Sequence, residues 1–121
     1  MAKQWWRELK KNMVSKTNYI INDLTEQEIC EALDYISITL KNPNASKRLY
    51  EDICEKIGQL VLFPNSGEIY NNEFVANQNV RRIAVDNYYL YYVYEKEKKL
   101  ITFVSFIHMT RNISVIIQEI L

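Results

Sequence analysis

The spacing of apolar residues changes once along this chain of 121 residues, and that change constrains the fold more than any other feature. Between residues 25 and 62 apolar side chains recur every three or four positions, which is the spacing of one helix face. Between residues 79 and 107 they alternate instead, and β-branched and aromatic residues dominate, which is typical of strands. The sequence therefore predicts a helical layer followed by a sheet, within the length of one domain.

The helical part divides in two at Asn42-Pro43, where Asn42 fits an N-cap and Pro43 the first position of a helix. In the first helix, Thr25 and Glu28 fit a capping box. The apolar stripe of that helix is Ile29, Leu33, Ile36 and Leu40. The stripe of the second helix is Ala45, Leu49, Ile53, Ile57, Leu60 and Val61. Because the connection is short, the two helices are expected to form an antiparallel hairpin.

Three strands are expected at 79–86, 88–95 and 100–107, with a charged turn at 95–99, and they should form an antiparallel meander. Residues 17–22 are predicted to add a short fourth strand. The expected fold class is α/β, more strictly α+β, with an antiparallel sheet of three to four strands and the helix hairpin packed on one face. The other face is also apolar, so either the segment 113–121 or a partner protein is expected to cover it.

Equal numbers of basic and acidic residues, 15 of each, conceal an uneven distribution. Residues 1–16 carry five basic and one acidic side chain, or +4, and are interpreted as a basic extension before a single domain at 17–121. Residues 17–75 carry −6 and residues 76–121 carry +2. A domain that is basic all over, the simplest kind of nucleic-acid binder, is excluded.

Localisation is predicted to be cytoplasmic, because the sequence has neither a membrane-spanning run nor a secretory signal. The two cysteines, Cys30 and Cys54, are interpreted as reduced, partly buried thiols. A disulfide between them stays open if their helices pack side by side. No glycine-rich phosphate loop or zinc-ligand spacing occurs, so neither a cofactor nor a metal is expected.

The candidate chemistry lies on the sheet, in Arg81, Arg82, Tyr88, Tyr91, His108 and Arg111. Because their strands are neighbours, we expect one of the two strand arginines, a tyrosine, His108 and Arg111 to meet at one edge. Arginine suits a phosphate, and histidine can transfer a proton near neutral pH. RNA carries its own nucleophile, the 2′-hydroxyl, so such a site needs no metal. The alternative is structural, with solvated arginines, packed tyrosines and a strand-end histidine that has no chemical role.

Two segments carry a resemblance to a known family: EALDYISITLKNPNASKRLYEDICEKIGQLVLFPNSG and NVRRIAVDNYYLYYVYEKEKKLITFVSFIHMTRN. Over roughly residues 17–117 the chain resembles the RelE/ParE superfamily of type II toxin–antitoxin toxins. The resemblance implies a growth-inhibiting toxin that a cognate antitoxin from the same operon holds inactive, in a toxin–antitoxin hetero-oligomer. It also implies one of two targets. RelE-like members cleave mRNA on the ribosome without a metal, whereas ParE-like members bind and poison DNA gyrase and are not nucleases.

Catalytic members of the superfamily use basic residues on the sheet and a histidine or tyrosine near the end of the last strand. Carried over to this chain, that pattern implies Arg81 or Arg82, His108 and Arg111, with Tyr88 or Tyr91 in support. The chain departs from the family's final motif at Thr110, where a basic residue is usual. This departure weakens the ribonuclease hypothesis and keeps a third one open, a degenerate toxin that only binds its antitoxin. Whether the protein is an enzyme is therefore left undecided by its sequence.

Overall fold

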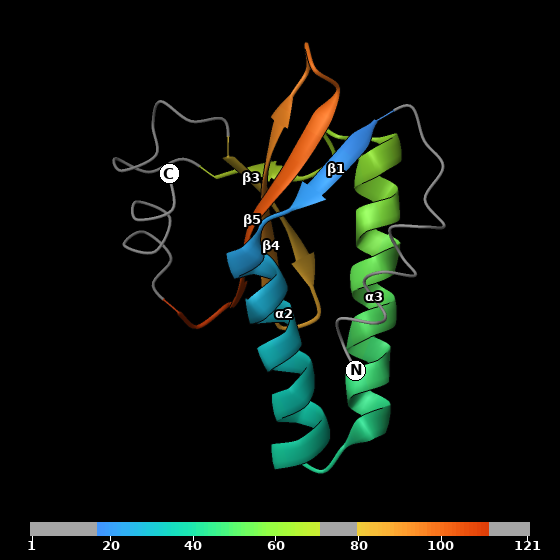
Figure 1. Cartoon of the computed structure of the whole chain (residues 1–121), viewed down its shortest axis with the longest axis vertical. Helices are drawn as coiled ribbons and strands as arrows, with labels where there is room; N and C mark the ends of the chain where they lie inside the picture. Colours follow the sequence, from blue (N-terminus) through green and yellow to red (C-terminus); the bar gives the residue numbers. More distant parts are fainter. Residues whose placement is uncertain (1–16, 71–79, 112–121) are drawn as a thin grey trace.

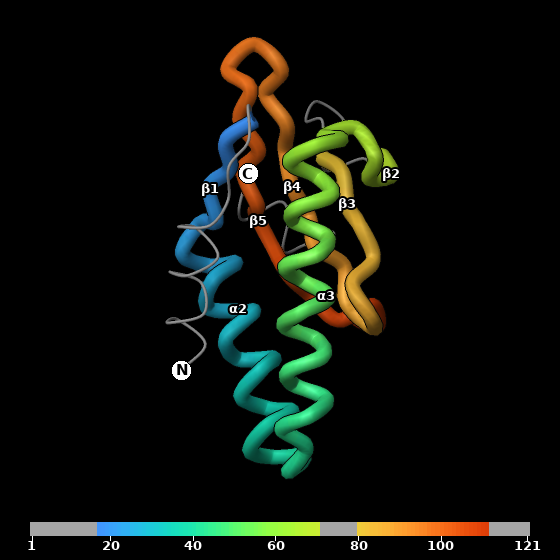
Figure 2. The backbone as a smooth tube through the Cα atoms, turned by 90° about the vertical axis from the view of Figure 1, so that its right-hand side faces the viewer, coloured from blue at the N-terminus to red at the C-terminus, as the bar shows by residue number. Residues whose placement is uncertain are grey.

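A computed structural model describes residues 17–70 and 80–111 of the chain, so the predicted basic extension and the predicted cover at 113–121 lie outside it. The elements in order are β1 (Asn18–Ile21), α2 (Asp23–Asp34), a π-helical segment η1 (Tyr35–Thr39), α3 (Pro43–Leu62), β2 (Glu68–Ile69), β3 (Val80–Val85), β4 (Tyr88–Glu95) and β5 (Leu100–His108). The two long helices form the predicted hairpin, whose connected end lies away from the β4–β5 turn (Figures 1 and 2).

The start of α2 differs from the predicted capping box. Asn22 is the N-cap, and its side-chain oxygen accepts a hydrogen bond from the Thr25 amide at 2.8 Å. The Thr25 hydroxyl lies 3.1 Å from the Phe103 carbonyl of β5, so Thr25 ties the helix to the sheet. Glu28 therefore falls in the second turn, where its carboxylate reaches β5 instead of the helix start.

The end of the first helix also departs from the predicted regular stripe. Ile29 and Leu33 are buried, but Leu40 is 54% exposed. The π-helical turns of η1 contain more residues than α-helical turns. Ile36 still packs against the core, but residues 38–40 are rotated off the packed face. The second helix follows the prediction, with Asn42 as N-cap, Pro43 in its first turn and its stripe from Leu49 to Val61 buried.

The meander of β3, β4 and β5 is antiparallel as predicted, but the complete sheet is mixed and has five strands in the order β1-β5-β4-β3-β2. β1 pairs with β5 in parallel, in register Asn18 with Leu100. This direction lets the chain pass from β1 directly into α2, on the face of the sheet that α2 and α3 cover, hereafter the helical face. The sequence did not predict β2, because two residues are too few to show an alternating pattern.

Two apolar clusters lie on opposite faces of the sheet. The larger one fills the space between the sheet and the two helices, and it includes Ile29, Ile53, Leu90, Tyr92 and Phe103. The smaller one lies on the face that neither α2 nor α3 covers, hereafter the open face. It consists of Val80, Tyr91, Val104 and Ile107, with Tyr70, Tyr89 and Val93 packed against them. The predicted apolar character of both faces is confirmed.

Both cysteines are of intermediate exposure, as the first interpretation had it, and the alternative disulfide between Cys30 and Cys54 does not form. Among the residues described, no helix is both long and apolar enough to cross a membrane.

Candidate functional site

The two predicted arginines lie on opposite faces of the sheet, because consecutive residues of a strand point in opposite directions. Arg81 is paired across the strands with Tyr92, which belongs to the core under the helices. Arg82 is paired with Tyr91, which belongs to the cluster on the open face. Each arginine therefore has a different set of neighbours.

Arg81 holds the loop that follows α3. Its Nη1 donates to the carbonyl oxygens of Asn65 at 3.1 Å and Gly67 at 2.8 Å. The Tyr92 hydroxyl completes this clamp, because it donates to the Pro64 carbonyl at 2.7 Å and accepts from the Gly67 amide at 3.1 Å. Burial raises the pKa of Tyr92, so this hydroxyl keeps its proton. The clamp joins four backbone groups of the loop to β3 and β4.

Arg82 is enclosed by aromatic rings on the open face. Its guanidinium carbon lies 3.9 Å from the ring centroid of Tyr89 and 5.1 Å from that of Tyr70, both within the range of cation–π attraction. It forms an ion pair with Glu68 of β2 and lies 3.4 Å from the Tyr91 hydroxyl. Burial opposes the charged form, but the hydrogen bonds to Tyr91 and Glu68 outweigh it and raise the pKa of Arg82. The positive charge of Arg82 is thus already compensated.

His108 ends β5 directly opposite Tyr88. The two rings meet edge to face with centroids 5.2 Å apart, and Tyr88 in turn stacks on Phe106 at 4.7 Å. Since Phe106 belongs to the core under the helices, the pair lies on the helical face. His108 Nδ1 is 2.9 Å from the Thr110 hydroxyl and accepts from the Thr110 amide at 3.3 Å. Thr110 thus orients the imidazole.

Glu28, which the sequence predicted to cap the start of the first helix, instead contacts β5. Its carboxylate accepts hydrogen bonds from the Ser105 hydroxyl at 3.0 Å and the Phe106 amide at 3.1 Å, in the part of β5 that extends past β1. Burial raises the pKa of Glu28, although these two hydrogen bonds and the nearby charge of Arg111 work in the opposite direction. Arg111 itself is exposed. Only the three-dimensional pairing of α2 with β5 reveals this contact.

Of the predicted meeting of a strand arginine, a tyrosine, His108 and Arg111 at one edge, the pair Tyr88 and His108 forms, but neither Arg81 nor Arg82 joins it. Arg82 and Tyr91 lie together on the open face, while Tyr88 and His108 lie together on the helical face. Tyr88 and Tyr91 are three residues apart on β4, which is about 10 Å along a strand. Arg81 binds the loop instead of joining either pair. Within the described part of the chain, no group of three His, Cys, Asp or Glu side chains is arranged to hold a metal ion.

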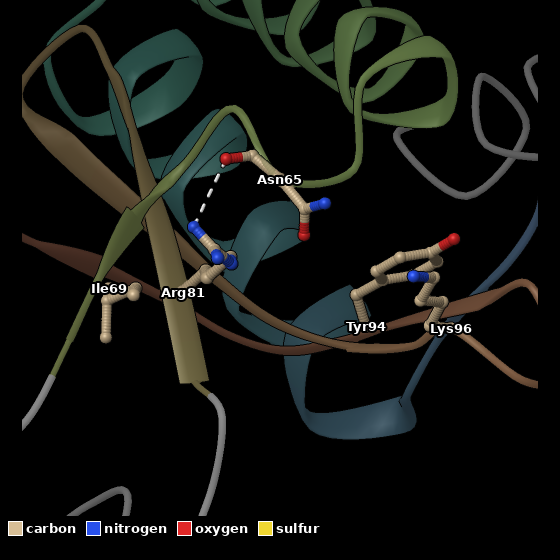
Figure 3. Close-up of a pocket in the computed structure, with 5 residues that line it drawn as sticks. All are labelled: Asn65, Ile69, Arg81, Tyr94 and Lys96. Carbon is tan, nitrogen blue, oxygen red and sulfur yellow. Dashed lines mark hydrogen bonds between the residues drawn. The ribbon is translucent and has the colours of Figure 1, made fainter.

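A hollow with a mixed polar and apolar lining, unnoticed in the sequence, lies where the loop after α3 approaches the β4–β5 turn. It is lined by Asn65, Ile69, Arg81, Tyr94 and Lys96 (Figure 3). The sequence signal for it was weak, because Lys96 belongs to a charged turn and Asn65 to a loop, and neither position suggests a binding site.

One comparison identifies the family. The family model described as "ParE toxin of type II toxin-antitoxin system, parDE" matches residues 19–113. No curated protein matches the chain by sequence. The matched residues run from the second residue of β1 through both helices to just beyond β5, so they contain all the elements described above except Asn18. With this match and the two-layer arrangement of sheet and helix hairpin, the chain belongs to the ParE toxin family of type II toxin–antitoxin systems, in which a toxin is paired with a cognate antitoxin.

Proposed function

We propose that this ParE-family toxin inhibits growth by binding DNA gyrase, and that it does not cleave RNA. The observation that carries the proposal is the separation of Arg82 and Tyr91 from Tyr88 and His108 onto opposite faces of the sheet, while Arg81 is held by the loop after α3. Metal-free cleavage of RNA needs a base, an acid and a cation within hydrogen-bond distance of one phosphate. Arg82 and His108 cannot serve one phosphate in the arrangement described.

The electrostatics of the arginines agree with this proposal. Glu68 already compensates Arg82, and two carbonyl groups hold Arg81 against the loop after α3 instead of beside Tyr88 and His108. A ribosome-bound enzyme has to contact many phosphates, each typically through a free Lys or Arg. The sheet half of the chain, at +2, provides few such groups. Binding to a protein target does not require them.

One observation favours the second candidate, a metal-independent endoribonuclease. Tyr88 and His108 bring a phenol and an imidazole together at the end of the sheet, and Arg111 follows three residues later. These groups are of the types that transfer protons and bind phosphate. Thr110, however, lies where the superfamily usually has a further basic residue, and its hydroxyl and amide both contact the imidazole.

Purified toxin should be assayed in parallel for inhibition of gyrase supercoiling and for cleavage of mRNA in a translating extract. We expect supercoiling to fall, transcripts to stay intact, and His108→Ala to inhibit gyrase within about twofold of the wild type, because His108 has no role in the proposed mechanism. Cleaved transcripts, with cleavage lost in His108→Ala, would refute the proposal in favour of the ribonuclease. If neither assay responds and the toxin expressed alone does not slow growth, the chain is a degenerate toxin that only binds its antitoxin.

A further inference from the structure

The hollow beside the β4–β5 turn has a volume of about 220 Å³ and two positive charges in its lining, Arg81 and Lys96. None of its other lining residues is acidic, since they are Asn65, Ile69 and Tyr94. In Figure 3, Arg81 lies on one side of this space and the neighbouring Tyr94 and Lys96 lie on the other, with the Asn65 amide between them. The site therefore offers cations and hydrogen-bond donors to an anion.

Among the residues that the structure describes, the two cations of the hollow differ from nearby basic residues in having no acidic partner. Arg82 is paired with Glu68, and Lys98 is paired with Glu95 at 3.3 Å. Within residues 17–70 and 80–111, neither Arg81 nor Lys96 forms an ion pair. A guanidinium has five N–H donors, and the two contacts of Arg81 with carbonyl groups use only Nη1. The group is thus held in place while its other nitrogens can still donate.

Apolar side chains at the same end of the molecule indicate what kind of anion fits. Ile69 lines the hollow and is 57% exposed, and Leu62 and Phe63, just before the loop, are 69% and 65% exposed. A nucleic-acid backbone would leave these side chains in water. A protein segment that carries an acidic residue next to apolar residues would satisfy the cations and cover the apolar groups together.

We propose that this hollow binds a carboxylate side chain from an acidic and apolar segment of the cognate antitoxin. The inference rests on the family's pairing of toxin with antitoxin and not on the proposed gyrase target. Arg81 and Lys96 would form ion pairs with the carboxylate, and Tyr94 and Asn65 would provide further polar contacts. Ile69 and Phe63 would contact the apolar neighbours of that acidic residue.

The test is a calorimetric titration of the full-length toxin with the purified antitoxin encoded in the adjacent reading frame, at low and at high salt. Lys96→Gln should weaken binding about three- to tenfold at low salt and reduce the dependence on salt, as expected for a partly exposed ion pair. Lys98→Gln is the matched control, because it removes the same charge from the same turn at a residue outside the hollow. It should change affinity less than about twofold.

Two further variants complete the experiment. Phe63→Ser should weaken binding without unfolding the toxin, because Phe63 is largely exposed, and Lys96→Arg should retain the affinity of the wild type. Equal affinities for Lys96→Gln and Lys98→Gln would overturn the proposal. So would binding of a single-stranded oligonucleotide that is lost in Lys96→Gln while antitoxin affinity is unchanged, since the hollow would then be a phosphate site. No gyrase is present in these titrations, so their outcome is independent of the proposed target.

Discussion

Gly67 lies at the centre of the clamp that holds the loop after α3, and replacing it with alanine should destabilise the toxin strongly. A Cβ atom at this position would lie 2.6 Å from the Tyr92 hydroxyl oxygen, 2.8 Å from Tyr92 Cε1 and 2.9 Å from the Arg82 carbonyl oxygen. The carbonyl belongs to the backbone of β3, and the Tyr92 side chain is fully buried, so neither group can move away easily.

The cost can be estimated from two contributions. Inserting a methyl group into a packed interior typically costs about 1–3 kcal/mol. Displacing the Tyr92 hydroxyl also disturbs its hydrogen bonds to Pro64 and Gly67, each worth about 1 kcal/mol. We therefore expect Gly67→Ala to lower the free energy of unfolding by about 3–5 kcal/mol. For a domain of this size, each kcal/mol corresponds to a decrease in Tm of about 4 °C.

Gly58 provides a control for the same chemical change. It lies inside α3, and a Cβ atom there would meet nothing within 4 Å. Gly58→Ala should therefore stabilise the protein by about 0.5–1 kcal/mol through helix propensity alone. Both variants can be compared by urea unfolding of the purified toxin. If Gly67→Ala unfolds within about 0.5 kcal/mol of the wild type, the loop is not clamped as described and the reasoning fails.

Two more predictions concern buried polar groups. Burial raises the pKa of Glu28 above its ordinary 4.5, so the folded state favours the neutral carboxyl. As the pH rises from 4.5 through the raised pKa, the wild type should therefore lose stability relative to Glu28→Gln. Urea unfolding across this pH range measures the difference, and parallel curves for the two proteins would contradict it. The Tyr19 hydroxyl is buried without a hydrogen-bond partner among the described residues, and burial, with a smaller effect of Cys54, raises the pKa of Tyr19 to about 12. Tyr19→Phe should stabilise the protein by about 1 kcal/mol, because it removes a buried hydroxyl that has no partner among the described residues. It should also remove the tyrosine ionisation near pH 12 from a spectroscopic titration. A loss of stability would contradict the prediction, since it would mean that the Tyr19 hydroxyl forms a stabilising contact.

The sequence predicts the helix hairpin and the meander well, because long periodic segments with clear caps dominate them. Asn42 and Pro43 mark the start of α3 correctly, and the change of period separates the two layers. The failures occur where tertiary contacts override local patterns. Thr25 looks like an N-cap, but its hydroxyl is near the Phe103 carbonyl, so the helix begins after Asn22. Similarly, Leu40 continues the apolar spacing but is exposed after the π-helical turns of η1.

The candidate site was harder to predict than the fold, because its geometry depends on one irregularity in β5. In β4, Tyr92 pairs with Phe103 and Leu90 pairs with Phe106. Two residues of β5, Val104 and Ser105, therefore lie opposite the single residue Tyr91. This bulge reverses the alternation of β5. Without it, a strict period of two from Phe103 would place His108 on the open face, the face of Arg82.

The bulge instead returns Phe106 to the core under the helices and carries His108 to the same face. A single additional residue thus separates the imidazole from the compensated arginine by the thickness of the sheet. The sequence LITFVSFIH shows no sign of it, because apolar residues occupy both faces of this strand and hide any change of phase. The residue types alone left a ribonuclease and a binding protein both open, whereas the side on which each residue lies supports our proposal of a toxin that acts by binding. The phase of β5 is therefore the structural feature on which the proposed function most directly depends.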